Sequence, residues 1–317
     1  MTNEEYVLSK IDRFSAGGGG LYSSFPRFIK LETSSNCTAR CLMCGIDEWK
    51  RGGAIMKDEL FFKIANEIIL HKNDVTKVAL FVGNEPLLDK SLAFKIKKFK
   101  DSNIAVNFST NASLLDFKKA KEILDSGLDA INFSIDSLDK KEYEKIRKNL
   151  IFERVMANVI CFLKMRNEKN YKTKIRVSII KSNANKECFD EIYNFWARVL
   201  DVSRGDSIRI DDLSYVYGTD SKKDTIEQMQ GNMEEIYKEA NKKPCYILWN
   251  TMVIKCDGSV ALCNVDQCRN VILGDLNTQS IQEIWTTSKV KEAYKQAHLK
   301  GGRGRINLCK NCLGWLE

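Results

Sequence analysis

Six apolar segments rich in β-branched residues recur up to about residue 213, and polar segments with helical spacing separate them. The candidate strands are residues 27–35, 77–82, 104–110, 130–136, 174–180 and 207–213. Amphipathic helix patterns occupy residues 58–71, 114–126, 139–148, 152–166 and 187–200. Strands that alternate with helices predict an α/β fold built from parallel βαβ units with right-handed crossovers. About six units fall short of the eight that close a TIM barrel, so a partial (β/α)6 barrel or a doubly wound sheet fits.

The pattern of the sequence changes near residue 242. Ile247–Lys255 and Ser259–Cys263 predict two strands joined at Asp257-Gly258, a hairpin signal. A helix pattern over Ser280–His298 and a Gly/Arg-rich loop at Gly301–Arg305 follow. We therefore expect three parts: a flexible leader over residues 1–26, an α/β domain over 27–241 and a small C-terminal domain over 242–317.

Composition and charge narrow the class of protein. The chain has 317 residues, 44% of them hydrophobic, which is enough to bury a substantial core. It contains no apolar run near 18 residues and begins with an acidic, polar stretch, so we expect no membrane segment, no secretion signal and a cytoplasmic location. The net charge of +8 mildly favours acidic ligands such as phosphates, but its scattered distribution argues against nucleic-acid binding.

Eleven cysteines are clustered mainly near the two ends of the chain. In a reducing cytosol, clustered cysteines bind metal more often than they form disulfides. Cys37, Cys41 and Cys44 directly follow the first candidate strand, and neither histidine, His71 or His298, is near them in sequence. Three thiolates with an open coordination position suit an iron–sulfur cluster whose fourth iron binds a substrate or cofactor. A structural zinc site, which requires a fourth ligand, is the alternative.

This loop and the strand ends after it resemble the radical S-adenosylmethionine (SAM) superfamily. The residues that carry the resemblance are Met43 before the last cysteine, Gly83-Asn84-Glu85-Pro86 after the second strand, Ser109-Thr110-Asn111 after the third and Ser134-Ile135-Asp136 after the fourth. The resemblance implies a partial TIM-type (β/α)6 barrel, a SAM-binding 4Fe-4S cluster on the three cysteines, and SAM contacts from the other motifs. Asn84 departs from the family's commonest motif, which has glycine at that position.

Each motif alone has an ordinary structural explanation. Glu85-Pro86 fits a turn, Asp136 fits a helix N-cap and Thr110-Asn111 fits the start of a loop. However, the C-terminal ends of parallel strands meet on one face of an α/β barrel, where such folds place their chemistry. The order of the motifs along the chain therefore predicts a single site.

A second set of cysteines lies in the C-terminal part, at Cys245, Cys263, Cys309 and Cys312. Four cysteines also suit a structural zinc ion, which is the alternative. The region resembles the SPASM/twitch domains of radical SAM proteins, in the shorter twitch form. That resemblance implies one auxiliary 4Fe-4S cluster ligated by all four cysteines, with electron transfer as its role.

Four cysteines remain outside both sets. Cys161 and Cys188 lie in helix patterns and are expected to pack as small hydrophobic side chains. Cys256 and Cys268 are candidate hydrogen-atom donors, and the alternative for both is packing or plain exposure. Cys268 is the preferred candidate, because a hairpin tip such as that at Cys256 more often faces solvent.

The resemblance implies cleavage of SAM to methionine and a 5'-deoxyadenosyl radical, which takes a hydrogen atom from the substrate. Two outcomes remain open: two-electron oxidation of an alcohol through the auxiliary cluster, or epimerisation with a thiol donor. The chain resembles small twitch and SPASM enzymes that act on sugars and polyols, whereas peptide-modifying relatives often carry an extra N-terminal domain. Because few residues precede the first strand, the resemblance implies a sugar- or polyol-type small molecule rather than a peptide. The expected partner is an electron donor such as flavodoxin or ferredoxin. A peptide-modifying enzyme and a non-enzymatic zinc-binding module are the alternatives.

Overall fold

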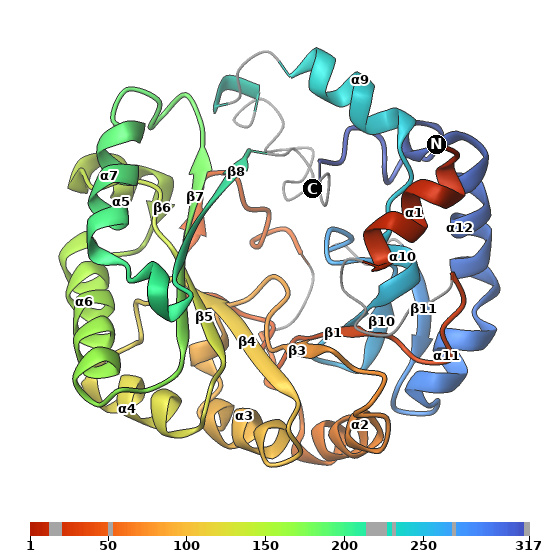
Figure 1. Cartoon of the computed structure of the whole chain (residues 1–317), viewed down its shortest axis with the longest axis horizontal. Helices are drawn as coiled ribbons and strands as arrows, with labels where there is room; N and C mark the ends of the chain where they lie inside the picture. Colours follow the sequence, from red (N-terminus) through yellow and green to blue (C-terminus); the bar gives the residue numbers. More distant parts are fainter. Residues whose placement is uncertain (13–20, 50–52, 214–226, 230–232, 268–270, 314–317) are drawn as a thin grey trace.

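One nine-stranded sheet runs through the computed structural model, in the order β11-β10-β9-β1-β3-β4-β5-β7-β8 (Figure 1). The structure describes residues 1–12, 21–49, 53–213, 227–229, 233–267 and 271–313. The strands of this sheet are β1 (Phe28–Leu31), β3 (Lys77–Ala79), β4 (Ala105–Thr110), β5 (Ala130–Ser134), β7 (Lys174–Lys181), β8 (Ser207–Asp212), β9 (Thr251–Ile254), β10 (Ser259–Ala261) and β11 (Ile272–Asp275). A two-stranded ladder joins β2 (Arg40–Cys41) to β6 (Arg147–Lys148).

All six predicted strands are present, and β1, β3, β4, β5, β7 and β8 pair in parallel. The connecting helices lie on the outside of the curved sheet (Figure 1). They are α2 (Asp58–Leu70), α3 (Leu92–Lys100), α4 (Phe117–Asp125), α5 (Lys140–Ile146), α6 (Phe152–Glu168) and α7 (Phe189–Val199). Helices on one face alone make this a partial barrel, as the family resemblance implied, and not a doubly wound sheet.

Buried and half-buried residues alternate along the strands, and this alternation explains why the helices cover one face of the sheet. In β4, Val106 and Phe108 are fully buried and join the main core, whereas Asn107 and Ser109 between them are only half-buried. The apolar residues therefore face the helices, and the polar residues face the inside of the barrel. The same alternation holds in β5, where Ile131 is buried beside half-buried neighbours.

The N-terminal part differs from the predicted leader. Residues Asn3–Asp12 form helix α1, whose Tyr6, Val7 and Ile11 pack in a cluster with Tyr246 and Trp249. The helix contacts α12 (Lys289–Gly301), at the other end of the chain. A flexible leader is therefore wrong for these residues, because their apolar side chains pack against the C-terminal region.

The C-terminal region continues the barrel sheet, since β9 pairs in parallel with β1 and antiparallel with β10. Only Thr251–Ile254 of the first predicted hairpin strand is extended, because Ile247–Asn250 forms the short helix α10. The remaining helices are α9 (Glu234–Lys242) and α11 (Ile281–Thr287), with 3-10 turns at η1 (Pro86–Leu88), η2 (Val202–Arg204) and η5 (Arg303–Arg305). Ser288 divides the predicted helix over residues 280–298 into α11 and α12, capping the latter. None of the described helices has both the length and the apolar character that crossing a bilayer requires.

Candidate active site and auxiliary metal centre

The first cysteine loop starts just after β1, at the C-terminal edge of the barrel. Within it, Cys41 belongs to β2, which pairs with Arg147 of β6. Asn111, at the end of β4, donates from Nδ2 to the Sγ of Cys37 at 3.6 Å. Arg147 donates from Nη1 to the Sγ of Cys41 at 3.5 Å. Two thiols of the loop therefore receive donors from other elements of the barrel edge.

The electrostatics of the loop suit a cationic group. Burial, together with the charges of Glu85, Cys41 and Cys44, raises the pKa of Cys37 to about 12. The three thiols are thus close enough to repel one another as thiolates. A metal centre would offset that repulsion, because thiolates, not thiols, are its ligands.

Glu85 connects two strand ends and is 1% exposed. Its Oε1 accepts hydrogen bonds from Thr110 Oγ1 at 2.7 Å and from the Leu87 amide at 3.1 Å, and its Oε2 accepts from the Asn111 amide at 2.8 Å. Burial raises the pKa of Glu85 to about 7, although these hydrogen bonds oppose the shift. The carboxylate therefore fixes the end of β4 against the η1 turn that begins at Pro86.

Other predicted residues occupy the same edge. Asn84, directly after Gly83, accepts from the Val82 amide at 3.0 Å, and its buried Nδ2 has no hydrogen-bond partner within the described residues. Met43 is buried against Ile146, Leu213 and Met229. Its place in the chain is the predicted one, but its contacts are those of a packed side chain.

Polar side chains form a chain across the inner face of the sheet. Asn132 of β5 donates to Ser109 Oγ of β4 at 3.0 Å and accepts from Ser178 Oγ of β7 at 2.8 Å. Ser134 lies at the end of β5, paired in register with Ser178. The strand-end motifs are therefore neighbours in space, although they are far apart in sequence.

Asp136 is fully buried and orients Arg147. Its Oδ2 accepts from Arg147 Nε at 2.7 Å, and its Oδ1 accepts from the Ile180 amide at 2.9 Å. The Asp136 charge, together with that of Cys41, keeps the pKa of Arg147 well above its usual value despite burial. In the structure the side-chain partner of Asp136 is the arginine beside Cys41, and the cofactor contact expected from the sequence stays a prediction.

The two candidate hydrogen-atom donors differ in what can be said of them. Cys256 is 4% exposed, and its thiol donates to the carbonyl oxygen of Ala54 at 3.3 Å. Burial, with the nearby Glu32 carboxylate, raises its pKa to about 12. The expectation that the hairpin tip exposes Cys256 is therefore wrong, because the tip folds against the segment after β1. Cys268 lies outside the described residues.

The second cysteine set converges on one cavity. Its lining includes Cys245, Cys263, Cys309 and Cys312 together with His298 and Arg303. Burial, together with the neighbouring Cys312 and Cys245, raises the pKa of Cys263 to about 12. In the part of the chain that the structure describes, no three Cys, His, Asp or Glu side chains converge as ligands of a single metal ion. The four thiols surround a shared space, which fits a multi-atom cluster.

Two basic side chains border this cavity. Arg303 is fully buried and donates to the carbonyl oxygens of Cys312 at 2.8 Å and Pro244 at 3.1 Å. His298 is also fully buried, and its Nδ1 accepts from the Cys245 amide at 3.1 Å. Burial and the Arg303 charge lower the pKa of His298 to about 4. Sequence analysis missed both residues, since nothing in their spacing marks them.

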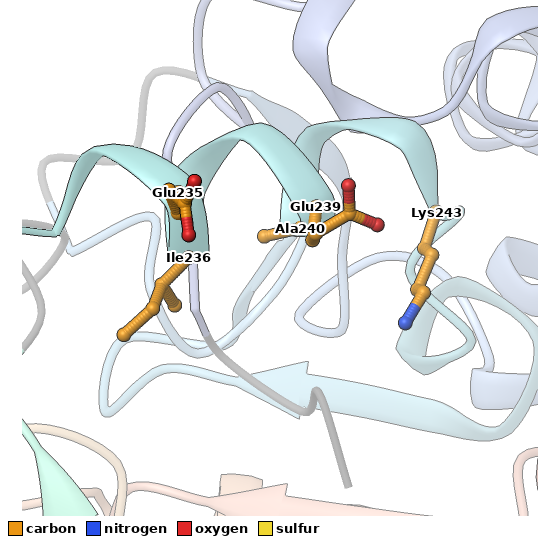
Figure 2. A pocket seen from close by; sticks show the side chains of 5 residues that line it. All are labelled: Glu235, Ile236, Glu239, Ala240 and Lys243. Carbon is orange, nitrogen blue, oxygen red and sulfur yellow. The ribbon is translucent and has the colours of Figure 1, made fainter.

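A separate pocket lies along α9 (Figure 2). Its lining consists of Glu235, Ile236, Glu239, Ala240 and Lys243. It includes no predicted site residue, and we assign it no role.

Family models match both halves of the chain. The model described as the radical SAM superfamily matches residues 31–194, and the SPASM model, described as an iron-sulfur cluster-binding domain, matches residues 245–313. The curated relatives include a GTP 3',8-cyclase of Lactiplantibacillus plantarum, 26% identical over 55% of this chain and 52% of that protein. Another is the tungsten-containing aldehyde ferredoxin oxidoreductase cofactor-modifying protein of Pyrococcus furiosus, 25% identical over 53% of this chain and 48% of that one. The chain spans about half the length of the curated relatives it matches.

Solved structures share the fold over most of the chain. BtrN in complex with AdoMet and 2-DOIA covers 91% of this chain and 93% of its own, with a TM-score of 0.58 and 16% identity. SuiB of Streptococcus suis bound to precursor peptide SuiA covers 97% and 74%, with a TM-score of 0.66 and 17% identity. AnSMEcpe with AdoMet and the Cp18Cys peptide covers 89% and 87%, with a TM-score of 0.61 and 16% identity. At these identities the likeness shows the fold alone.

Proposed function

The chain belongs to the radical SAM superfamily and carries a SPASM domain, and on that premise we propose that it oxidises an alcohol group of a sugar- or polyol-type small molecule. The two domains imply a SAM-binding 4Fe-4S cluster and an auxiliary cluster. When bound and reduced, the first cluster supplies the electron that splits SAM into methionine and the hydrogen-abstracting 5'-deoxyadenosyl radical. The oxidation then removes one hydrogen atom, one proton and one electron from the alcohol.

In this proposal Cys37, Cys41 and Cys44 hold the SAM-binding cluster. The donors from Asn111 and Arg147 support it, because a hydrogen bond or a positive charge at a cysteine sulfur stabilises the thiolate. Fixed donors also orient the loop before the cofactor arrives.

SAM itself would lie against the strand-end residues. The predicted set is Met43, Gly83, Asn84, Glu85, Pro86, Ser109, Asn111, Ser134 and Asp136. Both carboxylates in this set already bind protein groups, so we assign Glu85 and Asp136 to positioning the strand ends. The buried Nδ2 of Asn84 is the better candidate for a direct contact, because it is a donor still without a partner among the described residues.

One observation carries the choice of oxidation. Lys30, on the inner face of β1, is close enough to Cys263 for the two charges to interact. Cys263, which lines the cavity with Cys245, Cys309 and Cys312, therefore lies near the inner face of β1. We propose that these cysteines hold the auxiliary cluster, which when bound would supply an acceptor for the second electron.

Epimerisation is the second candidate reaction. It requires a thiol that faces the substrate, and Cys256 points at a backbone carbonyl while it is almost fully buried. Cys268 remains the candidate donor for that alternative. A peptide substrate is the second candidate class, since SuiB and anSMEcpe have peptides bound in their structures.

The test begins with anaerobic reconstitution, followed by iron and sulfide analysis. Reduced protein with SAM should release 5'-deoxyadenosine, and a Cys37→Ala variant should not. A colourless, zinc-only protein would refute the proposal and favour a binding module. We further propose a cytoplasmic enzyme with flavodoxin or ferredoxin as the electron donor. Dithionite replaces that donor in the assay, so the test does not depend on its identity.

Mass spectrometry of the product distinguishes the two reactions. With UDP-glucose, glucose 6-phosphate and myo-inositol as trial substrates in deuterated water, oxidation gives a product two hydrogens lighter. Epimerisation instead gives one solvent deuterium and no other change in mass. If Cys268→Ala blocks turnover and deuterium enters the product, oxidation is the wrong choice.

A further inference from the structure

Basic side chains gather on the inner face of the barrel sheet. Lys30 of β1, Lys77 of β3 and Arg176 of β7 each alternate with buried residues that face the helices, and Arg209 of β8 pairs in register with the inward-facing Ser178 of β7. Residues at alternate positions of a strand point to opposite faces, so these four point inward. We call these four residues the inner basic cluster.

Sheet curvature brings the cluster together. In the sheet order, β3, β4, β5 and β7 separate β1 from β8. Lys30 nevertheless interacts electrostatically with Arg209 and with Lys77, and Lys77 interacts with Arg176. Burial, together with the charges of Arg209 and Lys77, lowers the pKa of Lys30 to about 7.

Within the described residues of the six barrel strands, the inward-facing cations outnumber the inward-facing acids. Among the described inward-facing residues of the six barrel strands, Asp211 is the single acid, and it pairs with Arg209 at 2.7 Å. The other inward-facing polar groups are neutral, such as Asn132 and Ser178. The described inner face therefore carries an excess of positive charge, with Lys30 and Arg209 half-buried and Lys77 and Arg176 exposed to solvent.

We infer that the inner basic cluster binds a phosphate or diphosphate group of the substrate, an inference that rests on the proposed function. A doubly charged anion relieves the repulsion among several cations better than a single carboxylate does. In addition, the guanidinium group of arginine can form two parallel hydrogen bonds to a phosphate. The position also fits. Arg209 pairs in register with Ser178, which pairs with Ser134 at the strand end. A phosphate at the cluster therefore leaves an attached sugar ring near the predicted SAM contacts.

Calorimetry on the reconstituted holoprotein tests this assignment, with pyrophosphate, D-glucuronate and myo-inositol as probes. Pyrophosphate should bind, and Lys30→Met and Arg176→Gln should each weaken its binding at least tenfold. The matched control is Lys121→Gln, which removes an exposed cation on α4 and should leave binding unchanged. Raising the salt concentration should weaken binding, because the attraction is electrostatic.

Three outcomes would overturn the inference: no binding of pyrophosphate, equal binding by all variants, or binding of D-glucuronate as tight as that of pyrophosphate. The last outcome would assign the site to a carboxylate. Release of 5'-deoxyadenosine without substrate is measured on the same preparations. If that release persists while pyrophosphate fails to bind, the anion site is wrong and the proposed function still stands.

A second inference concerns His298 and rests on a different observation. Its Nδ1 accepts a hydrogen bond from the Cys245 amide, so Nδ1 carries no proton and the ring proton is on Nε2. That Nε2 is buried and has no acceptor within the described residues, although His298 lines the cavity of the four cysteines. A buried donor without an acceptor costs about 1–3 kcal/mol.

We propose that Nε2–H of His298 donates a hydrogen bond to a sulfur atom of the auxiliary cluster. His298 is then a positioning residue, because it acts through the cluster and touches no substrate. Hydrogen bonds to the sulfur atoms are among the factors that set the reduction potential of an iron–sulfur cluster. Because the bond stabilises the more negative, reduced form, it should raise the potential and favour acceptance of an electron.

The test isolates the auxiliary cluster by replacing Cys37, Cys41 and Cys44 with alanine. In that background, His298→Phe should shift the reduction potential to lower values. His71→Phe is the matched control, since His71 stacks on Phe25 and is not part of the cavity lining. An unchanged potential in His298→Phe would overturn the proposal.

A second measurement needs no variant of His298. Electron–nuclear double resonance on the reduced auxiliary cluster, with 15N-labelled histidine, should detect coupling to a ring nitrogen. Absence of that coupling overturns the proposal even if His298→Phe fails to assemble the cluster.

Discussion

The buried ion pair of Asp136 and Arg147 offers a quantitative test of how the barrel edge is built. The side chains are 1% and 11% exposed, and the Nε–Oδ2 distance is 2.7 Å. Arg147→Met removes the charge and leaves the Asp136 carboxylate with the Ile180 amide as its remaining described hydrogen-bond donor. Removing one partner of a buried ion pair lowers the free energy of unfolding by about 3–5 kcal/mol. The equilibrium constant for folding should therefore fall at least about 150-fold.

The assay is urea denaturation of the apoprotein for Arg147→Met, Asp136→Asn and the double variant. In the double variant, Asp136→Asn removes the carboxylate charge that Arg147→Met leaves unpaired. Its loss in the free energy of unfolding should therefore be about 1–3 kcal/mol smaller than the sum of the two single losses. Lys140→Met is the control, because Lys140 and Glu153 form an exposed pair worth under about 1 kcal/mol. The reasoning is refuted if Arg147→Met costs no more than this control, or if the single losses simply add.

Three further predictions follow from named contacts. Burial raises the pKa of Glu85 to about 7, so the folded apoprotein holds a proton that the unfolded chain releases near pH 4.5. Its free energy of unfolding should therefore fall by about 3 kcal/mol between pH 4.5 and 7 from this group, and urea titrations of Glu85→Gln should lack that component. Asp206→Asn should cost about 3–5 kcal/mol in the same assay, because Asp206 pairs with fully buried Arg166 at 2.5 Å. Cys263→Ala should halve the iron bound per chain and leave 5'-deoxyadenosine release intact, and unchanged iron would contradict the assigned ligands.

Much of the barrel could be predicted because its strands are short and their alternation is regular. Each candidate strand became a strand, since buried Ile, Val and Phe residues face one helical layer. Helix α3 was missed because four lysines obscure its buried stripe of Leu92, Ile96 and Phe99. Helix α1 depends on tertiary packing against α12, which no local pattern reveals.

The site was predictable in position but not in detail. Spacing placed the motifs at strand ends, and the structure brings Ser109, Asn132 and Ser178 into one hydrogen-bonded chain there. The spacing of residues in the sequence does not show what a carboxylate binds. The hydrogen bonds that Glu85 and Asp136 accept from other protein groups were therefore not predicted. The inner basic cluster was equally hidden, because its members come from four strands far apart in the sequence.

The parallel pairing of β9 with β1 explains how the two cysteine sets serve one reaction. That pairing extends the barrel sheet into the C-terminal region, so β9 lies beside the first barrel strand, and β10, which Cys263 follows, is the next strand of the same sheet. Lys30 of that strand interacts with Cys263 on one side and with Arg209 on the other. A substrate anchored by its phosphate at the inner basic cluster would thus lie between the hydrogen-abstracting radical and the auxiliary centre. In the proposed function, this shared sheet would hold the auxiliary centre near the substrate.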